Sequence, residues 1–140
     1  MAVIISSQSD ESFLQTIQCE QLQYLADIEP ALGGQGQAPA PFDLLFGAWG
    51  ACTNMTLQVY CRRKGWPLHR VETTLQHQGG GAQSVGPKNI QKTIRLWGPL
   101  NPAQVTHLGR VAEKCPVHLF LMRQAPAQFL TTAIERVAEH

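Results

Sequence analysis

The 140-residue sequence has little charge of either sign and no long apolar run. Its 11 basic and 10 acidic residues give a formal net charge of +1, so we expect no long-range attraction to nucleic acid or to an anionic membrane. No apolar run reaches the ~18 residues that a membrane-spanning helix needs. The N-terminus also lacks the basic segment and the apolar run of a signal peptide, and we therefore expect a cytoplasmic protein.

The sequence contains no Cys-x-x-Cys pair. Its four cysteines are Cys19, Cys52, Cys61 and Cys115. Because cytoplasmic thiols are kept reduced, we expect no framework of structural disulfides. A straight helix would separate Cys52 from Cys61 by about 13.5 Å, beyond the ~7 Å between Cα atoms that a disulfide allows. Cys19 and Cys61 are therefore interpreted as small packing residues.

Alternation of polar and apolar residues predicts β-strands, and their order with the helices predicts an α+β fold in one domain over residues 1–140. The segments that alternate or carry short apolar runs are residues 2–6, 13–19, 21–28, 71–78, 89–98 and 127–138. The glycine-rich residues 79–87 predict a hairpin loop between two of these strands.

A long helix is predicted from Pro41 to about Lys64. Proline suits the first helical position, and Gly65 followed by Pro67 favours an end at this point. Apolar residues occur nearly all round the helix, which is typical of a buried helix. One stripe along it contains Leu45, Ala48, Trp49, Cys52, Met55, Thr56, Val59 and Arg63.

A second helix is predicted to follow Asn101, which suits the N-cap, and Pro102, which suits the first turn. It is expected to end near Cys115, because Pro116 disfavours the helical conformation in the residue before it. Residues 117–122 are expected to form one further short turn.

Cys52, within the long helix, and Cys115, at the end of the second, leave several interpretations open. Free cysteine is among the most buried residue types, so both thiols can be packing residues. A static disulfide is a second interpretation, which a reducing cytoplasm disfavours. In a third, one thiolate attacks a peroxide and the other thiol condenses with the resulting sulfenic acid. Such a thiolate needs a neighbouring cation, and the candidates are His118, Arg62, Arg63 and Arg110.

A zinc site is a weaker interpretation of the same residues. Cys115 and His118 have Cys-x-x-His spacing, and Cys52 could add a third ligand. A structural zinc site needs four ligands, so this partial set does not predict a metal.

Three segments resemble the OsmC/Ohr family of osmotically inducible and organic hydroperoxide resistance proteins. They read "PAPFDLLFGAWGACTNMTLQVYCRRKGWPL", "EPALGGQGQ" and "AEKCPVHLFL", within residues 24–121. The resemblance implies an OsmC-like α+β fold in which two central long helices pack on antiparallel sheets. It also implies that two chains intertwine as a homodimer with active sites at the subunit interface.

The resemblance further implies reduction of organic hydroperoxides to alcohols by a dithiol reductant, without metal, haem or flavin. It assigns Cys52 as the peroxidatic cysteine and Cys115 as the resolving cysteine. Three apolar residues of the long helix are expected to contact an alkyl substrate, and His118 is a candidate thiolate partner. These three residues are Phe46, Trp49 and Met55.

The sequence departs from the family branch that binds its thiolate with an arginine of the N-terminal strands, since no arginine precedes Arg62. Asp43 is interpreted as a residue that stabilises the helix N-terminus rather than as a catalytic acid. The departure leaves an alternative function open, a redox-sensing or small-molecule-binding module without turnover. A purely structural scaffold is the third possibility.

Overall fold

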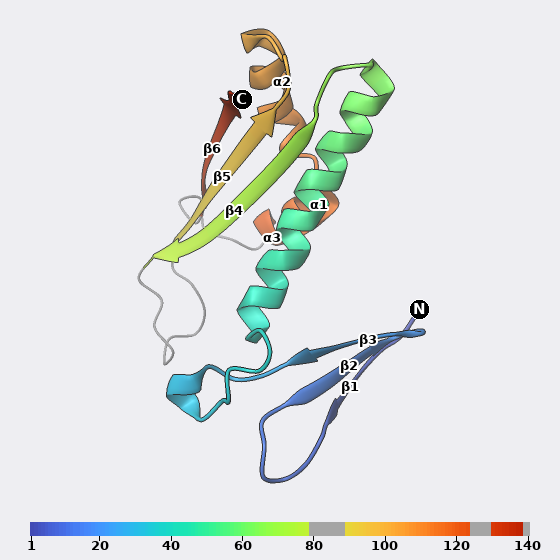
Figure 1. Ribbon diagram of the computed structural model, residues 1–140, viewed down its shortest axis with the longest axis vertical. Coiled ribbons are helices and arrows are strands. Elements are labelled where there is room, and N and C mark those ends of the chain that lie inside the picture. Colours follow the sequence, from blue (N-terminus) through green and yellow to red (C-terminus); the bar gives the residue numbers. More distant parts are fainter. Residues whose placement is uncertain (79–88, 124–129, 139–140) are drawn as a thin grey trace. The chain divides into compact units, whose positions relative to one another are not determined.

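The computed structural model describes residues 1–78, 89–123 and 130–138 (Figure 1). The predicted hairpin loop over residues 79–87 lies outside these ranges. Two compact units make up the chain, Met1–Phe46 and Gly47–His140, and each is considered by itself. In the described part of the chain, no helix is both long and apolar enough to cross a membrane.

The first unit contains an antiparallel meander of three strands. They are β1 (Val3–Ser7), β2 (Gln15–Cys19) and β3 (Leu22–Ala26), paired in the order β1-β2-β3. These strands confirm the first three predicted from alternation, and a 3-10 turn, η1 (Pro30–Leu32), follows them. The sheet buries Ile17 but leaves every side chain of β1 exposed.

Helix α1 (Pro41–Lys64) begins and ends where the sequence predicts. At its N-terminus the Asp43 carboxylate accepts a hydrogen bond from the backbone N–H of Ala40 at 3.1 Å, in agreement with a stabilising role for this residue. At its C-terminus Gly65 adopts a left-handed φ of 68°, and the N–H of the next residue donates to the Cys61 carbonyl at 2.9 Å. This is the Schellman ending that the glycine permits.

The second unit contains a mixed three-stranded sheet in the order β4-β5-β6. Strands β4 (Arg70–Gln78) and β5 (Asn89–Trp97) are antiparallel, whereas β5 and β6 (Leu130–Val137) are parallel. The prediction of antiparallel sheets throughout is therefore wrong for this pair. The chain between β5 and β6 makes a crossover through two helices, which is the connection that a parallel pair requires.

The two crossover helices are α2 (Pro102–Ala112) and α3 (Pro116–Met122). The predicted N-cap is confirmed, because the Asn101 side chain accepts from the Gln104 N–H at 2.8 Å while the Gln104 side chain accepts from the Asn101 N–H at 2.9 Å. Helix α2 ends earlier than predicted, and the expected short turn is a helix of 7 residues.

Within the described residues, α1 with 24 residues is the one long helix of the chain, and α2 has 11. The pair of central long helices therefore remains a prediction that requires a second chain.

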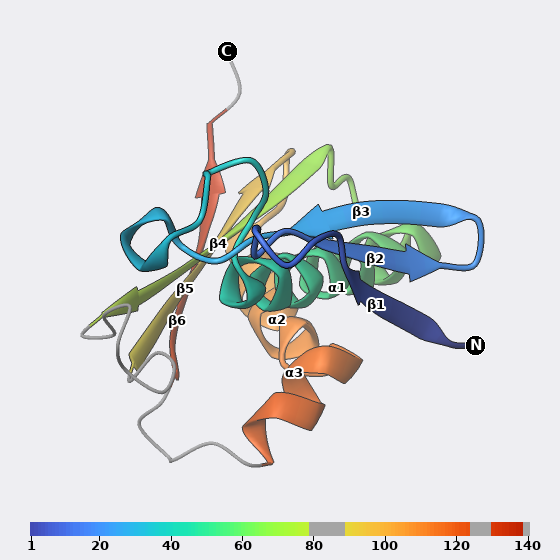
Figure 2. The same cartoon turned by 90° about the horizontal axis from the view of Figure 1, so that it is seen from below.

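Helices α1 and α2 lie against one face of the β4-β5-β6 sheet (Figures 1 and 2). Side chains of α1, α2 and β5 form a shared core there, which includes Leu57, Ile94 and Leu108. The prediction that α1 is buried all round is wrong for this chain, since Met55 and Val59 are 61% and 48% exposed. Only the side of the helix that faces the sheet is covered. That side carries Trp49, Gly50, Thr53, Leu57 and Cys61.

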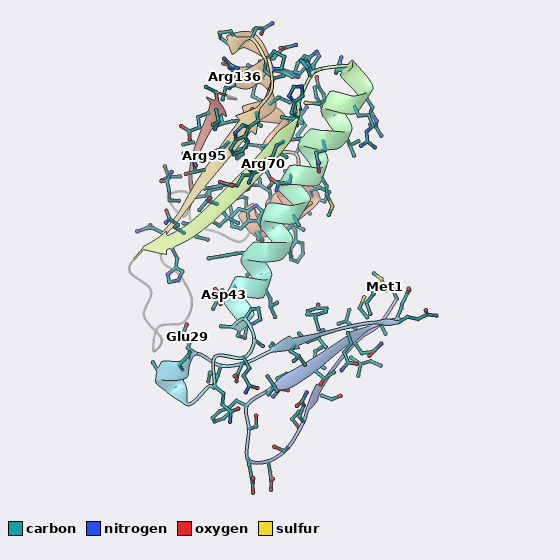
Figure 3. The ribbon with its side chains drawn as sticks, in the orientation of Figure 1. Met1, Glu29, Asp43, Arg70, Arg95 and Arg136 are labelled. Carbon is teal, nitrogen blue, oxygen red and sulfur yellow. The ribbon has the colours of Figure 1, made fainter. Side chains whose placement is uncertain are left out.

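The opposite face of the sheet carries charged residues at neighbouring positions on the three strands. Arg95 on β5 pairs with Glu135 on β6 at 2.6 Å and lies 3.9 Å from Glu72 on β4 (Figure 3). Exposed ion pairs of this kind contribute little to stability. These exposed pairs show that this face of the sheet is in contact with solvent. A site sheltered from water would therefore lie on the other face, which the helices cover.

Leu57→Ala is expected to lower the free energy of unfolding by about 2–5 kcal/mol, because Leu57 is fully buried between α1 and the sheet. Gln58→Ala, at the exposed next position of the same helix, is the control and should stay within about 0.5 kcal/mol of the wild type. Urea unfolding measures both. Equal midpoints for the two variants would contradict the placement of the core.

Candidate active site

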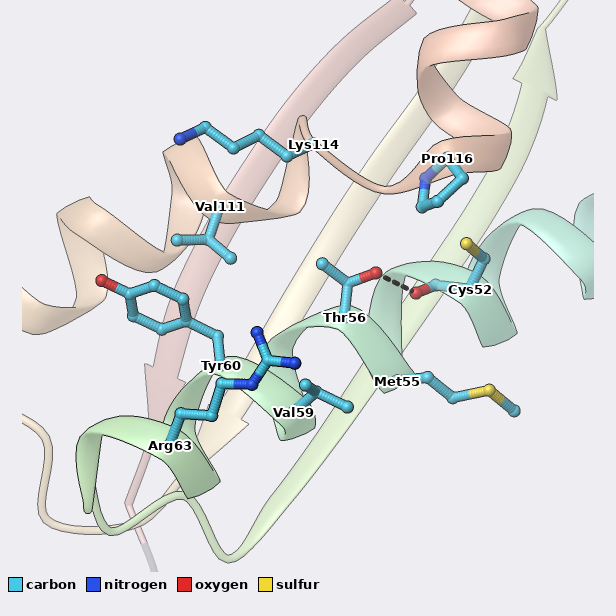
Figure 4. A pocket seen from close by; sticks show the side chains of 9 residues that line it. All are labelled: Cys52, Met55, Thr56, Val59, Tyr60, Arg63, Val111, Lys114 and Pro116. Atoms are coloured by element: carbon cyan, nitrogen blue, oxygen red, sulfur yellow. Dashed lines mark hydrogen bonds between the residues drawn. The ribbon is translucent and has the colours of Figure 1, made fainter.

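Cys52 lies in the middle of α1, half-buried, with its sulfur directed toward the start of α3 (Figure 4). The hydroxyl of Thr56, one turn further on, donates to the Cys52 carbonyl oxygen at 2.8 Å and also lies within hydrogen-bonding reach of the thiol. A rigid helix thus fixes the sulfur at the boundary between the core and solvent.

Cys115 is the N-cap residue of α3 and is fully buried. Its sulfur accepts a hydrogen bond from the backbone N–H of His118 at 3.5 Å. Pro116 starts the helix and keeps Cys115 extended, which is why a cysteine can occupy the cap position. The Cys115 side chain acts on Cys52 as a hydrogen-bond partner that lowers the pKa of the Cys52 thiol, so the two side chains are neighbours. The structure therefore brings together the two thiols that the sequence singled out.

Lys92, which the sequence analysis missed, is the third residue of this cluster. It lies on β5 with 1% of its surface exposed, and its ammonium group donates to the Thr53 hydroxyl at 2.8 Å. Its Nζ also lies 5.2 Å from the ring centroid of Trp49. The alternation of β5 did indicate its burial, because Lys92 lies on the same face of the strand as the buried Ile90 and Ile94.

The surroundings of Cys52 favour its thiolate. Burial raises the pKa of the Cys52 thiol, but hydrogen bonds from the Cys115 side chain and the Val117 backbone act against burial. The Thr56 hydroxyl and the positive charge of Lys92 act in the same direction, and the net effect is a pKa below the ordinary value.

The surroundings of Cys115 favour its neutral thiol. Burial raises the pKa of Cys115, and the hydrogen bond with Cys52 raises it further. The two sulfurs are therefore inequivalent. Cys52 is the stronger acid and the better nucleophile near neutral pH, while Cys115 keeps its proton.

His118 is not cationic near neutral pH. Burial lowers the pKa of its imidazole, and the nearby charge of Lys92 lowers it again. Its ring lies 5.8 Å from that of Trp49, and no hydrogen-bond partner for its Nδ1 occurs among the residues that the structure describes. The positive charge that acts on the Cys52 thiol therefore comes from Lys92 and not from His118, which was the expected thiolate partner.

An open groove of about 440 Å³ runs from Cys52 along α1 (Figure 4). Its lining residues are Cys52, Met55, Thr56, Val59, Tyr60, Arg63, Val111, Lys114 and Pro116. Among the three residues expected to contact an alkyl substrate, Met55 lines this groove. Trp49 is fully buried behind the thiols, and Phe46 lies in the other unit, with its ring 6.4 Å from that of Phe42.

All four cysteines are free thiols, with Cys61 buried in the core and Cys19 half-buried on β2. Within residues 1–78, 89–123 and 130–138, no three His, Cys, Asp or Glu side chains gather closely enough to hold a metal ion. Cys115, His118 and Cys52 thus do not form the core of a zinc site.

The OsmC-like protein family matches the sequence over residues 34–129, and the chain therefore belongs to the OsmC/Ohr family. The match runs across the boundary between the two units. A comparison with curated proteins finds no match.

Solved structures share the fold over nearly the whole chain. An OsmC-like protein from Mycoplasma pneumoniae is 16% identical with a TM-score of 0.75, covering 100% of this chain and 99% of its own. An organic hydroperoxide resistance protein OsmC from Legionella pneumophila is 16% identical with a TM-score of 0.65, covering 99% and 98%. The organic hydroperoxide resistance protein OhrB of Bacillus subtilis is 16% identical with a TM-score of 0.61, covering 98% of each chain.

Cys52 is expected to react with iodoacetamide before the two buried thiols, Cys61 and Cys115, because its pKa is lowered whereas burial raises the pKa of both others. The rate at Cys52 should rise with pH to a midpoint below the ordinary 9.0. Peptide mass spectrometry after timed alkylation measures each site. A midpoint for Cys52 at or above that of Cys61 would rule out the described environment.

Proposed function

We propose that this protein reduces organic hydroperoxides to alcohols through Cys52 and Cys115. The observation that carries the proposal is a pair of interacting thiols with opposite pKa shifts, of which Cys52 lines an apolar groove. Membership of a family with organic hydroperoxide resistance proteins among its structural relatives supports the same reaction.

In the first step the Cys52 thiolate attacks the distal oxygen of the hydroperoxide. The O–O bond breaks, and the sulfur is oxidised to a sulfenic acid while the peroxide is reduced. The leaving alkoxide takes a proton from water and departs as the alcohol. Because the thiolate and not the thiol is the nucleophile, the lowered pKa of Cys52 supplies the reactive form near neutral pH.

In the second step the Cys115 thiol condenses with the sulfenic acid, forming a disulfide and releasing water. The interaction of the two side chains in the reduced protein supports this pairing. An external dithiol then reduces the disulfide by thiol–disulfide exchange and restores both thiols. A cytoplasmic location would supply such reductants.

The groove beside Cys52 is proposed as the substrate-binding site. Met55, Val59 and Val111 give it apolar walls that match an alkyl or aryl peroxide better than hydrogen peroxide. Burying the organic part of the substrate there positions the O–O bond near the sulfur.

A homodimer is part of the proposal. Val3, Ile4 and Ile5 on β1 are exposed in the single chain. Apolar side chains gathered on one strand indicate a surface that a second copy would cover. The intertwined arrangement implied by the family would cover such a strand.

Redox sensing without turnover is the second candidate function. Cys115 has no exposed surface, so a reductant can reach the disulfide only through the half-buried Cys52. Slow reduction would leave the protein oxidised after one peroxide, as in a sensor. Repeated consumption of peroxide separates the enzyme from the sensor.

Cys52→Ser is expected to reduce the consumption of cumene hydroperoxide with a dithiol to the uncatalysed background, because the nucleophile is lost. Cys19→Ser is the control, since Cys19 lies on β2 in the other compact unit and has no role in the proposed reaction, and it should retain turnover. Peroxide assays over several dithiols measure both. If wild type consumes no more than one equivalent with every reductant, the sensor is supported instead.

Cys115→Ser is expected to retain the first oxidation and lose the disulfide. One equivalent of peroxide should convert Cys52 to a sulfenic acid that persists and reacts with dimedone, whereas the wild type should yield an intramolecular disulfide. Intact-mass spectrometry distinguishes the two products. A disulfide that forms equally well in Cys115→Ser would show that Cys115 is not the resolving residue.

Val59→Ala is expected to lower kcat/KM for cumene hydroperoxide by up to about tenfold while leaving hydrogen peroxide unaffected, because part of the groove wall is removed. Gln58→Ala, its neighbour outside the groove, should change neither value. Parallel loss on both peroxides in Val59→Ala would point to a fault in the thiols and would refute the groove as the binding site.

A further inference from the structure

We infer that Lys92, held between Thr53 and Trp49, is the cation that stabilises the Cys52 thiolate in this chain. Its part in peroxide reduction rests on the proposed function, but its effect on thiol ionisation does not. The N-terminal strands of this protein contain no arginine that could bind the thiolate, and Lys92 on β5 would supply the positive charge instead.

The burial of Lys92 is the first argument. With 1% of its surface exposed, the ammonium group has lost its hydration, and one neutral hydroxyl at 2.8 Å replaces only part of it. The face of Trp49 at 5.2 Å adds a weaker attraction. A buried cation with so little direct compensation favours a negative charge beside it, and Cys52 and Cys115 are the thiols that act on it.

The other candidate cations are either exposed to solvent or neutral near pH 7. Arg63 and Lys114 line the groove, but both are exposed, so water and salt screen their charges. Arg62 is exposed as well, and His118 is neutral near pH 7 for the reasons given above. Among these groups, Lys92 is the cation that combines charge with shelter from solvent.

The titratable groups around Lys92 come from three segments. Burial lowers the pKa of Lys92 to about 8, and the thiols of Cys115 and Cys52 and the Glu113 carboxylate all act to raise it. His118 faces the same cluster in its neutral form. Lys92 is therefore mostly protonated at pH 7 and loses its charge as the pH passes about 8.

Ionisation of the site follows a simple balance. The Cys52 S–H bond breaks, its proton passes to water through the groove, and the electron pair stays on sulfur beside the Lys92 ammonium. Lys92 itself neither gains nor loses a proton in this step. Thr53 and Trp49 act as positioning residues, because they contact the Lys92 ammonium group.

Lys92→Met tests the inference, since methionine fills a similar volume without charge. The pKa of the Cys52 thiol, measured from the pH dependence of its alkylation, should rise, so that less of the thiol is ionised near pH 7. Lys92→Arg should keep the pKa low, because the charge is retained. Arg62→Met removes an exposed cation from the same helix as Cys52 and should leave the pKa of Cys52 unchanged.

A purely structural role for Lys92 predicts a different result. Lys92→Met would then change the unfolding midpoint while the Cys52 pKa stays at the wild-type value, and this outcome overturns the inference. Because alkylation needs no peroxide, the measurement remains valid even if the protein shows no peroxidase turnover. The two proposals can therefore fail separately.

A second measurement covers the case in which Lys92→Met does not fold. Side-chain NMR of 13C-labelled lysine follows the titration of Lys92 in the wild type and in Cys52→Ser. Linkage requires that a thiolate that Lys92 stabilises also stabilises the Lys92 ammonium. The pKa of Lys92 should therefore fall in Cys52→Ser, and an unchanged value overturns the inference.

Discussion

The site depends on one costly arrangement, an ammonium group held inside the sheet–helix core. Isolated buried charges are disfavoured by several kcal/mol unless a partner of opposite sign or a set of hydrogen bonds offsets the lost hydration. Lys92 has one hydroxyl and one aromatic face as its direct contacts, and two ionisable thiols and the Glu113 carboxylate act on it. The charge of Lys92 and the acidity of Cys52 are therefore two aspects of the same local balance.

The fold assembles this arrangement from three segments that are far apart in sequence. Helix α1 supplies Cys52 and Thr53, β5 supplies Lys92, and the crossover between β5 and β6 supplies Cys115. The parallel pairing of β5 with β6 matters here, because it requires a crossover connection and thereby brings the start of α3 back over the sheet. Cys52 and Lys92 lie within a helix and a strand, and Cys115 is held as the N-cap of α3.

Local signals predicted the helices and strands and most of their ends, while the pairing and packing between these elements were harder to predict. Proline at position 41 and the glycine at position 65 marked both ends of α1, and Asn101 marked the start of α2. The parallel pairing of β6 was not predictable, since alternation does not reveal the direction of a neighbouring strand. The buried face of α1 was misjudged because a helix that is apolar nearly all round carries little directional signal.

The two thiols were identified from the residues as candidates, and the resemblance gave each its role. Their interaction and their opposite pKa shifts required the structure. Lys92 was not predicted because the candidate cations were all close to Cys52 or Cys115 in sequence, although the alternation of β5 places Lys92 on the buried face of the strand. No sequence pattern could show that this lysine contacts Thr53 and Trp49 and acts on the two thiols.

The sulfur of Cys115 serves two purposes, since it belongs to the thiol pair and is also the acceptor that caps the first turn of α3. Converting it from a thiol to a disulfide changes the electron density offered to the His118 N–H and ties the beginning of α3 covalently to α1. Helix α3 also carries the exposed side chains of Leu119 and Phe120, the latter 70% exposed. A disulfide formed in the proposed reaction would therefore constrain the helix that presents these two side chains.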